Sequence, residues 1–170
     1  MKRSTLNVMT IGYEGAALQD FLQTLKRAQV TLLLDVREIA LSRRKGFSKT
    51  ALSEALAAAG IDYRHERTLG SPKEVRHQLR ADGNYQRYFR DFREYLTTQR
   101  TLLDSLAEEL CGAVALLCYE RNAAECHRSV VAQALATRTK TSVRHLEVTH
   151  HGPTRSTARA DSRQGVSATE

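Results

Sequence analysis

Short apolar runs alternate along the chain with longer segments in which apolar residues recur at every third or fourth position. The short runs predict β-strands, and the helical spacing between them predicts amphipathic helices. The predicted strands cover residues 7–11, 31–36, 61–65, 114–117 and 142–148. The predicted helices begin near Leu18, Ser48, Pro72, Tyr85, Leu102 and Val130.

Regular alternation of strands and helices is typical of α/β proteins with a parallel sheet. The run Leu32-Leu33-Leu34 is apolar on both faces of its strand, as interior strands of such sheets are. We therefore predict a single three-layer α/β domain in residues 1–148, with a mostly parallel five-stranded sheet and helices on both faces. This architecture is Rossmann-like or flavodoxin-like.

The composition changes after about residue 148. Residues 154–170 are rich in Ser, Thr, Ala and Arg, which predicts a flexible tail over 149–170. No apolar run approaches the roughly 20 residues of a membrane span. No long apolar segment follows the basic start Met1-Lys2-Arg3. We therefore expect a cytoplasmic protein that does not bind a membrane.

The net charge of +7 is the compositional feature that bears on function. A basic protein favours anionic partners, here an anionic small molecule or a nucleic acid. A solvated basic surface explains the charge equally well, so the charge alone does not choose a function.

Polar residues follow four of the five predicted strands. In a parallel sheet the carboxyl ends of the strands meet at one edge, where ligands bind. The polar residues that we expect at this edge are Tyr13 after the first strand, Asp35, Arg37, Arg43 and Arg44 after the second, His65 after the third, and Cys118, Glu120, Cys126, His127 and Arg128 after the fourth. The sequence therefore predicts one polar pocket built from four loops.

The catalytic candidates are Cys126, Glu120, His127 and Asp35. We expect Cys126 in the first turn of a helix, beside His127 and Arg128, where the helix dipole and nearby cations lower a thiol pKa. Glu120 or His127 would transfer protons. Cys126 could equally be a small buried residue that packs its helix on the sheet, and Cys118 is expected to play a supporting part, for example as a resolving thiol.

The ligand-binding candidates are Tyr13, Arg37, Arg43, Arg44, His65, Cys118 and Arg128. Several N–H donors around one site suit a phosphate group. Three alternatives remain open from the residues alone: an Asp35–Arg37 ion pair across the strand end, a purely structural His65, and a solvated loop at residues 43–45.

Metal and cofactor motifs are sparse. The chain has one C-x7-C-H segment at Cys118, Cys126 and His127 and no second pair of ligands, whereas structural zinc sites usually show paired close spacings. Glycine-rich dinucleotide and P-loop motifs and the zinc deaminase motif are absent. We therefore predict no metal and no cofactor.

Six segments together resemble one family. They are residues 10–15, 34–37, 42–49, 60–63 and 69–70, and the pair 118–120 with 126–128. The chain is similar, over about residues 7–148, to members of the domain of unknown function 488 family. The resemblance implies a compact α/β domain with a shared polar site and no established reaction. The residues that match the family's signature are Asp35, Arg37, Arg43, Arg44, Cys118, Glu120, Cys126, His127 and Arg128.

Three functions remain in view. The first is an enzyme that acts on a phosphate-bearing substrate, such as a nucleotide or nucleic acid, with a cysteine thiolate in its pocket. The second is a non-catalytic nucleic-acid-binding module, suggested by the arginine-rich residues 64–100. The third is a redox or metal switch that uses Cys118 and Cys126. An aromatic stripe from Tyr85 to Tyr95 has helical spacing, which favours core packing over stacking on bases.

Overall fold

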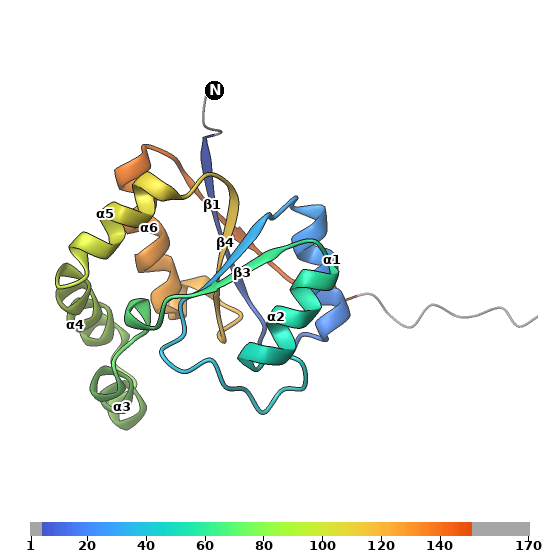
Figure 1. Ribbon diagram of the computed structural model, residues 1–170. Coiled ribbons are helices and arrows are strands. Elements are labelled where there is room, and N and C mark those ends of the chain that lie inside the picture. The colour runs from blue at the N-terminus through green and yellow to red at the C-terminus, as the bar shows by residue number, and fades with distance from the viewer. Residues whose placement is uncertain (1–4, 151–170) are drawn as a thin grey trace, which may run out of the picture.

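The computed structural model describes residues 5–150 and contains one five-stranded parallel sheet (Figure 1). Its strands are β1 (Leu6–Gly12), β2 (Leu32–Asp35), β3 (Asp62–His65), β4 (Gly112–Cys118) and β5 (Val143–Leu146). They lie in the order β3-β2-β4-β1-β5, and every neighbouring pair is parallel. The predicted parallel sheet is confirmed, whereas most of the predicted tail, residues 151–170, lies outside the described residues.

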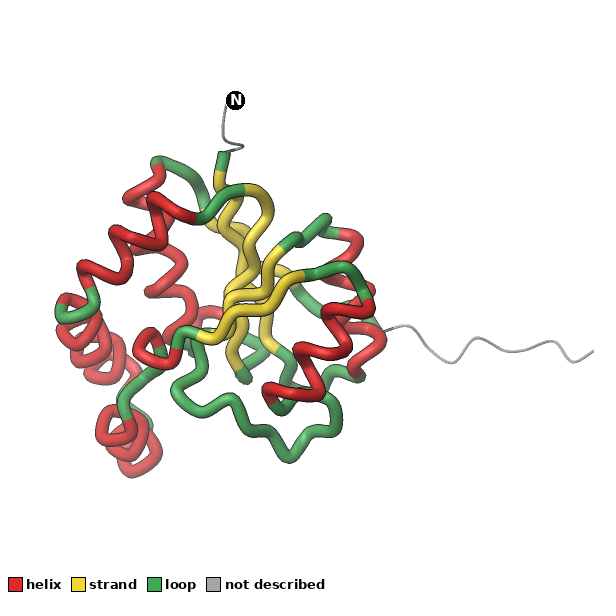
Figure 2. Tube along the Cα trace, viewed as in Figure 1, coloured by secondary structure: helices red, strands yellow, loops and turns green. Residues whose placement is uncertain are grey.

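Helices cover both faces of the sheet (Figure 2). On one side are α1 (Leu18–Arg27) and α2 (Lys49–Ala58), and on the other are α4 (Tyr85–Thr97), α5 (Arg100–Glu109) and α6 (His127–Thr139). The helix α3 (Lys73–Asp82) packs against α4, and two short 3₁₀ turns are η1 (Arg67–Leu69) and η2 (Ala123–Glu125). The three-layer α/β architecture is therefore confirmed. Within residues 5–150, no helix combines the length and the apolar character that crossing a bilayer requires.

The apolar run of β2 explains why both layers form. Leu33 packs in one core cluster with Phe21 of α1, and Leu34 packs in the other with Phe92 of α4. Both leucines are fully buried. Because successive strand residues point to opposite faces, a strand that is apolar at both positions needs helices on both sides.

The central position of β4 determines which loops can meet. Cys118 of β4 is opposite Gly12 of β1, and Leu117 is opposite Asp35 of β2. The carboxyl ends of β2, β4 and β1 are therefore adjacent. In Rossmann and flavodoxin folds the first two strands are neighbours, whereas here β4 lies between them.

The aromatic stripe of α4 contributes to the core, as its spacing predicts. Tyr88, Phe92 and Leu96 are buried, and Phe92 and Leu96 belong to the cluster between the sheet and its α4–α6 side. At the start of the helix, Asn84 accepts a hydrogen bond from the backbone amide of Arg87, which caps the first turn. Tyr85 in that first turn is exposed, so the stripe leaves the core there.

Candidate functional site

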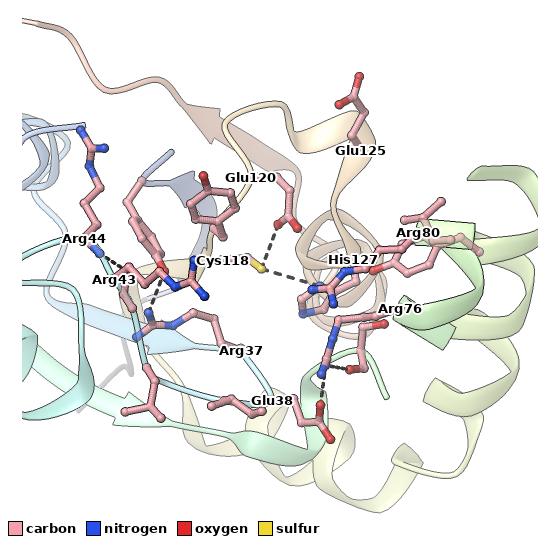
Figure 3. Close-up of a pocket in the computed structure, with 18 of the residues that line it drawn as sticks. Arg37, Glu38, Arg43, Arg44, Arg76, Arg80, Cys118, Glu120, Glu125 and His127 are labelled. Atoms are coloured by element: carbon pink, nitrogen blue, oxygen red, sulfur yellow. Dashed lines mark hydrogen bonds and ion pairs between the residues drawn. The ribbon is translucent and has the colours of Figure 1, made fainter. Parts of the chain in front are cut away.

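A pocket of about 790 Å³ lies at the carboxyl edge of the sheet (Figure 3). The loops after β1, β2 and β4 line it on one side, and α3 and the start of α4 line it on the other. The predicted site residues that line it are Tyr13, Arg37, Arg43, Arg44, Cys118, Glu120 and His127. Four others, Asp35, His65, Cys126 and Arg128, do not line it. The fold thus brings together most of the residues that the strand-end argument selected.

Two glycines allow the walls of this pocket to approach one another. A Cβ atom on Gly12 would lie 1.8 Å from the carbonyl oxygen of Glu120, and one on Gly70 would lie 2.2 Å from the amide nitrogen of Glu38. The backbone of Glu14 also donates a hydrogen bond of 2.8 Å to the carbonyl of Tyr119. The β1 and β4 loops are therefore held together backbone to backbone, which fixes the position of Glu120 over the end of the sheet.

Asp35 and Arg37 form a buried bidentate ion pair at the end of β2. Arg37 Nε donates to Asp35 Oδ1 at 2.8 Å, and its second guanidinium nitrogen donates to Oδ2 at 2.6 Å. The Arg37 amide and the Tyr63 hydroxyl also donate to this carboxylate. Burial by itself would lower the pKa of Arg37, but the hydrogen bonds and charge of Asp35 raise it. Burial and the same carboxylate raise the pKa of the Tyr63 hydroxyl.

This pair argues against a catalytic part for Asp35. Both carboxylate oxygens already accept two hydrogen bonds each, and the side chain is fully buried. A carboxylate has about four lone-pair positions in all, so none remains for a substrate. The expectation of a catalytic Asp35 is corrected to a structural one, because the group is saturated and lies behind Arg37.

Arg37 also anchors the loop that carries the basic residues. Its guanidinium donates to the carbonyl of Phe47 at 2.8 Å and to the hydroxyl of Tyr13 at 3.1 Å. The Tyr13 ring stacks on Phe47 with 4.4 Å between ring centroids. Residues 37 and 47 are the two ends of the basic loop, so the hydrogen bond from Arg37 to the Phe47 carbonyl joins these two ends. Arg44 Nε is tied in turn to the carbonyl of Ala16.

Two predicted ligand-binding residues face elsewhere. His65 is at the end of β3, an edge strand, and its Nε2 lies 2.7 Å from the carbonyl oxygen of Arg37. Arg128 is almost fully buried and donates to the carbonyls of Glu120 and Arg121. Both side chains hold backbone in place behind the pocket wall. We expected them to contact a ligand, and the structure instead gives them a supporting part.

Sulfur, imidazole and carboxylate groups gather at the point where β4 ends and α6 begins. The Cys118 thiol donates to Glu120 Oε2 at 3.1 Å, and its Sγ lies 3.7 Å from His127 Nδ1 (Figure 3). Cys126 Sγ lies 4.0 Å from the same nitrogen. The other ring nitrogen, Nε2, lies 2.7 Å from the carbonyl oxygen of Val36. All three cysteines of the chain are free thiols.

Cys126 does not have the lowered pKa that its place beside a helix predicts. It is the N-cap residue of α6, its side chain is fully buried, and the Arg128 guanidinium is occupied by backbone carbonyls. Burial raises the pKa of the Cys126 thiol, and the hydrogen bond and charge of Cys118 raise it further. His127 acts in the opposite direction but does not outweigh burial. The raised pKa argues against the expected thiolate in the metal-free protein, because desolvation exceeds the helix and cation effects.

His127 and Glu120 are shifted toward their charged forms. Burial alone would lower the pKa of His127, but its hydrogen bond to Cys126, its contact with the Val36 carbonyl and the charge of Glu120 raise it. Burial alone would raise the pKa of Glu120, but hydrogen bonds from Cys126, its own backbone and Cys118 lower it. The wall of the pocket therefore holds a carboxylate and a basic imidazole side by side.

Sequence reasoning missed the contribution of α3 and α4. Arg76 and Arg80 line the pocket from α3, and Tyr85 and Tyr88 line it from the start of α4. Arg76 pairs with Glu38 and donates to the Ser71 carbonyl. The spacing of Arg76 and Arg80, four residues apart, places both on one helix face. This four-residue spacing was visible in the sequence, but the sequence did not show that this face of α3 lies toward the pocket.

Comparison with known proteins identifies the family and no activity. No curated protein and no solved structure matches this chain. A family model described as "Domain of unknown function DUF488" matches residues 17–135, which span α1 through most of α6 and include every signature residue named above. Since the matched region covers well over half of the chain, this protein belongs to the DUF488 family of proteins of unknown function.

Proposed function

We propose that this protein is an enzyme that acts on a phosphate-bearing small molecule of the nucleotide class, bound at the carboxyl edge of its sheet. One observation carries the proposal. Five arginines line the same pocket as three glutamates, and they are Arg37, Arg43, Arg44, Arg76 and Arg80. Guanidinium groups match phosphate oxygens in geometry and charge, so such a cluster favours a phosphate group over a neutral ligand.

Three of these arginines form no ion pair within the part of the chain that the structure describes. Arg37 is paired with Asp35 and Arg76 with Glu38. Among residues 5–150, no acidic side chain forms an ion pair with Arg43, Arg44 or Arg80. Arg43 and Arg44 lie on the β2 loop and Arg80 lies on α3, so a phosphate between them would receive donors from two sides of the pocket.

The aromatic residues at this edge suit the remainder of a nucleotide. Tyr85 and Tyr119 both line the pocket and expose 40% and 46% of their surface. The Tyr119 ring meets Tyr13 edge-on, with 5.4 Å between centroids, so it is supported from behind. Exposed aromatic rings beside arginines are the pattern on which nucleobases stack.

Reactive groups line the wall that faces the arginines. Glu120, His127 and Cys118 are all in the pocket, so a ligand held by Arg43 and Arg80 would contact them. Cys118 replaces Cys126 as the thiol within reach of a ligand, since Cys126 is fully buried outside the lining. Glu120 is the group best placed to accept a proton, because its carboxylate already accepts one hydrogen bond from a thiol.

A calorimetric titration tests the binding half of this proposal. Inorganic phosphate, nucleosides and nucleoside mono-, di- and triphosphates are titrated into the full chain. We expect the phosphorylated ligands to bind and the nucleosides not to bind. Arg43→Ala and Arg80→Ala should each weaken binding by about tenfold or more, since a hydrogen bond to a charged group contributes roughly 1.5–3 kcal/mol.

Arg27→Ala is the matched control for charge. Arg27 is an exposed arginine at the end of α1, outside the pocket lining, and its removal changes the net charge equally. If Arg27→Ala and Arg43→Ala weaken binding equally, the effect comes from overall charge, and the proposed binding in the pocket is contradicted. The enzymatic half is tested by chromatography of the bound nucleotide after incubation, in which Glu120→Gln should keep binding and lose conversion.

A nucleic-acid-binding module is the second candidate. The observation that favours it is the number of arginines on the outer surface of α4, such as Arg90, which is largely exposed. A longer anion could run from the pocket along this helix. The two candidates differ in their dependence on ligand length and on salt.

A further inference from the structure

We propose that Cys118, Cys126 and His127 bind one thiophilic divalent cation of the zinc class at the floor of the pocket. The proposal rests on the arrangement of donor atoms alone, so it does not depend on the ligand of the arginine cluster. Linear spacing along the chain did not favour zinc, because only one pair of cysteines and one histidine are present. The fold supplies what the spacing lacks, since β4 and α6 bring the donors together.

The donor atoms are already close to tetrahedral coordination distances. Sγ of Cys118, Sγ of Cys126 and a ring nitrogen of His127 all lie within 4.8 Å of one another. Nδ1 of His127 is 3.7 Å from the first sulfur and 4.0 Å from the second. Bonds of about 2.3 Å to sulfur and about 2.0–2.1 Å to nitrogen place sulfur and nitrogen about 3.6 Å apart across a tetrahedral zinc ion. The two sulfur–nitrogen separations are therefore within about half an ångström of the tetrahedral value. The two sulfurs, which lie within 4.8 Å of each other, would come to about 3.8 Å apart on the ion.

The chemistry of the donors selects the metal. Two thiols and an imidazole are soft or borderline ligands, which bind zinc and related ions rather than magnesium or calcium. All three side chains are buried, with Cys126 at 0% exposed and Cys118 and His127 at 5% each. A doubly charged cation would balance the two thiolates that form when the thiol protons leave on metal binding.

A backbone carbonyl orients the histidine for this task. His127 Nε2 lies 2.7 Å from the carbonyl oxygen of Val36. A carbonyl can only accept a hydrogen bond, so Nε2 carries a hydrogen. Once metal binding displaces any proton from Nδ1, the lone pair of that nitrogen faces the two sulfurs. Metal-binding histidines usually donate their other ring nitrogen to a carbonyl or carboxylate in this way.

The fourth coordination position would face the pocket. Cys118, Glu120 and His127 line the pocket (Figure 3), whereas Cys126 is fully buried and is not part of the lining. Glu120 Oε2 is 3.1 Å from Cys118 Sγ, so the fourth position, open to a ligand, would lie beside this carboxylate. Three protein ligands with one open or exchangeable position is the arrangement of catalytic rather than structural zinc sites. Such a metal would act as a Lewis acid on an oxygen of the bound ligand.

Cobalt binding tests the site directly. The full chain, without an affinity tag and kept reduced, is titrated with Co²⁺ alone and then with Zn²⁺. We expect one Co²⁺ per chain, with the visible bands of tetrahedral cobalt and a sulfur-to-cobalt charge-transfer band, all abolished by Zn²⁺. Absence of binding, or a spectrum of nitrogen and oxygen ligands only, would overturn the proposal.

The third cysteine provides a matched control. Cys111 is exposed and belongs to no group of metal-ligand candidates among residues 5–150. Cys111→Ser should bind Co²⁺ as the native chain does, whereas Cys118→Ser and Cys126→Ser should each weaken binding at least tenfold and reduce the charge-transfer band. Equal binding by all three variants contradicts the site. If a variant does not fold, X-ray absorption on the zinc-loaded native chain decides, with two sulfur neighbours at about 2.3 Å expected and none found if the assignment is wrong.

Discussion

The carboxylate of Asp35 and the guanidinium of Arg37 form a two-point contact at the end of β2, with hydrogen bonds of 2.8 and 2.6 Å. Both side chains are buried, and Arg37 also reaches the carbonyl of Phe47. The pair therefore connects the end of a central strand to the far end of the basic loop. Arg43 and Arg44 owe their position at the pocket to this connection, although neither residue of the pair is free to react.

Asp35→Asn should destabilise the protein strongly. Removing one partner leaves a buried, unbalanced guanidinium, which typically reduces stability by about 3–5 kcal/mol. Urea unfolding followed by circular dichroism measures the effect. Asp104→Asn is the control, because Asp104 pairs with Arg138 at 2.6 Å but is 54% exposed, and such surface pairs contribute about 1 kcal/mol or less. Similar losses for both variants would contradict the structural part assigned to Asp35.

Gly12→Ala should damage both stability and ligand binding. The new Cβ would lie 1.8 Å from the Glu120 carbonyl oxygen, so the β4 loop must move. Overpacking of this kind typically reduces stability by about 1–3 kcal/mol. Gly83→Ala is a control with a positive φ of 63° and no heavy atom within 4 Å, and its strain should reduce stability by about 1–2 kcal/mol without changing ligand affinity. An unchanged ligand affinity in Gly12→Ala would show that the close approach of the β1 and β4 loops does not shape the binding pocket.

Iodoacetamide should distinguish Cys111 from Cys126 in the metal-free protein. Cys111 is exposed and should react fastest at neutral pH. Burial raises the pKa of Cys126, so its thiolate fraction at neutral pH is smaller than that of an ordinary cysteine, and its labelling should accelerate only as the pH rises above the usual thiol range. Mass spectrometry of the labelled peptides at several pH values provides the measurement. Labelling of Cys126 at neutral pH as fast as Cys111 would restore the activated thiol that the sequence suggested.

Ligand length and salt separate the enzyme from the nucleic-acid module. A pocket of about 790 Å³ accommodates a nucleotide, so affinity should not increase steadily from a mononucleotide to long oligonucleotides. Fluorescence anisotropy with single strands of increasing length, at several salt concentrations, measures this. If affinity instead grows with length and falls steeply with salt, counterion release along the strand dominates. The protein would then be better described as a nucleic-acid-binding module than as an enzyme.

The sheet and the position of the pocket were predictable because they depend on periodicity and on strand ends. Leu33 and Leu34 require helices on both faces whatever the details of packing. Tyr13, Arg37 and Cys118 meet because parallel strands end at one edge. These are consequences of pattern and topology, and both can be read from a single sequence.

The direction of individual side chains was not predictable. Cys118 ends β4, and Cys126 follows η2 eight residues later, yet only Cys118 lines the pocket. Arg128 looked like a ligand contact, but it binds carbonyls of its own loop. Arg80 was missed because helical spacing defines a face of α3 without saying what that face meets. The direction of each of these side chains depends on tertiary packing, which the local sequence pattern does not reveal.

A crystal structure of the protein soaked with a mixture of nucleotides tests the central claim most directly. We expect phosphate density between the β2 loop and α3, with oxygens within about 3 Å of the guanidinium groups of Arg43 and Arg80. Density for a base beside Tyr85 or Tyr119 would identify the ligand class. An empty pocket at saturating nucleotide, or phosphate bound only at other arginines, would contradict the account.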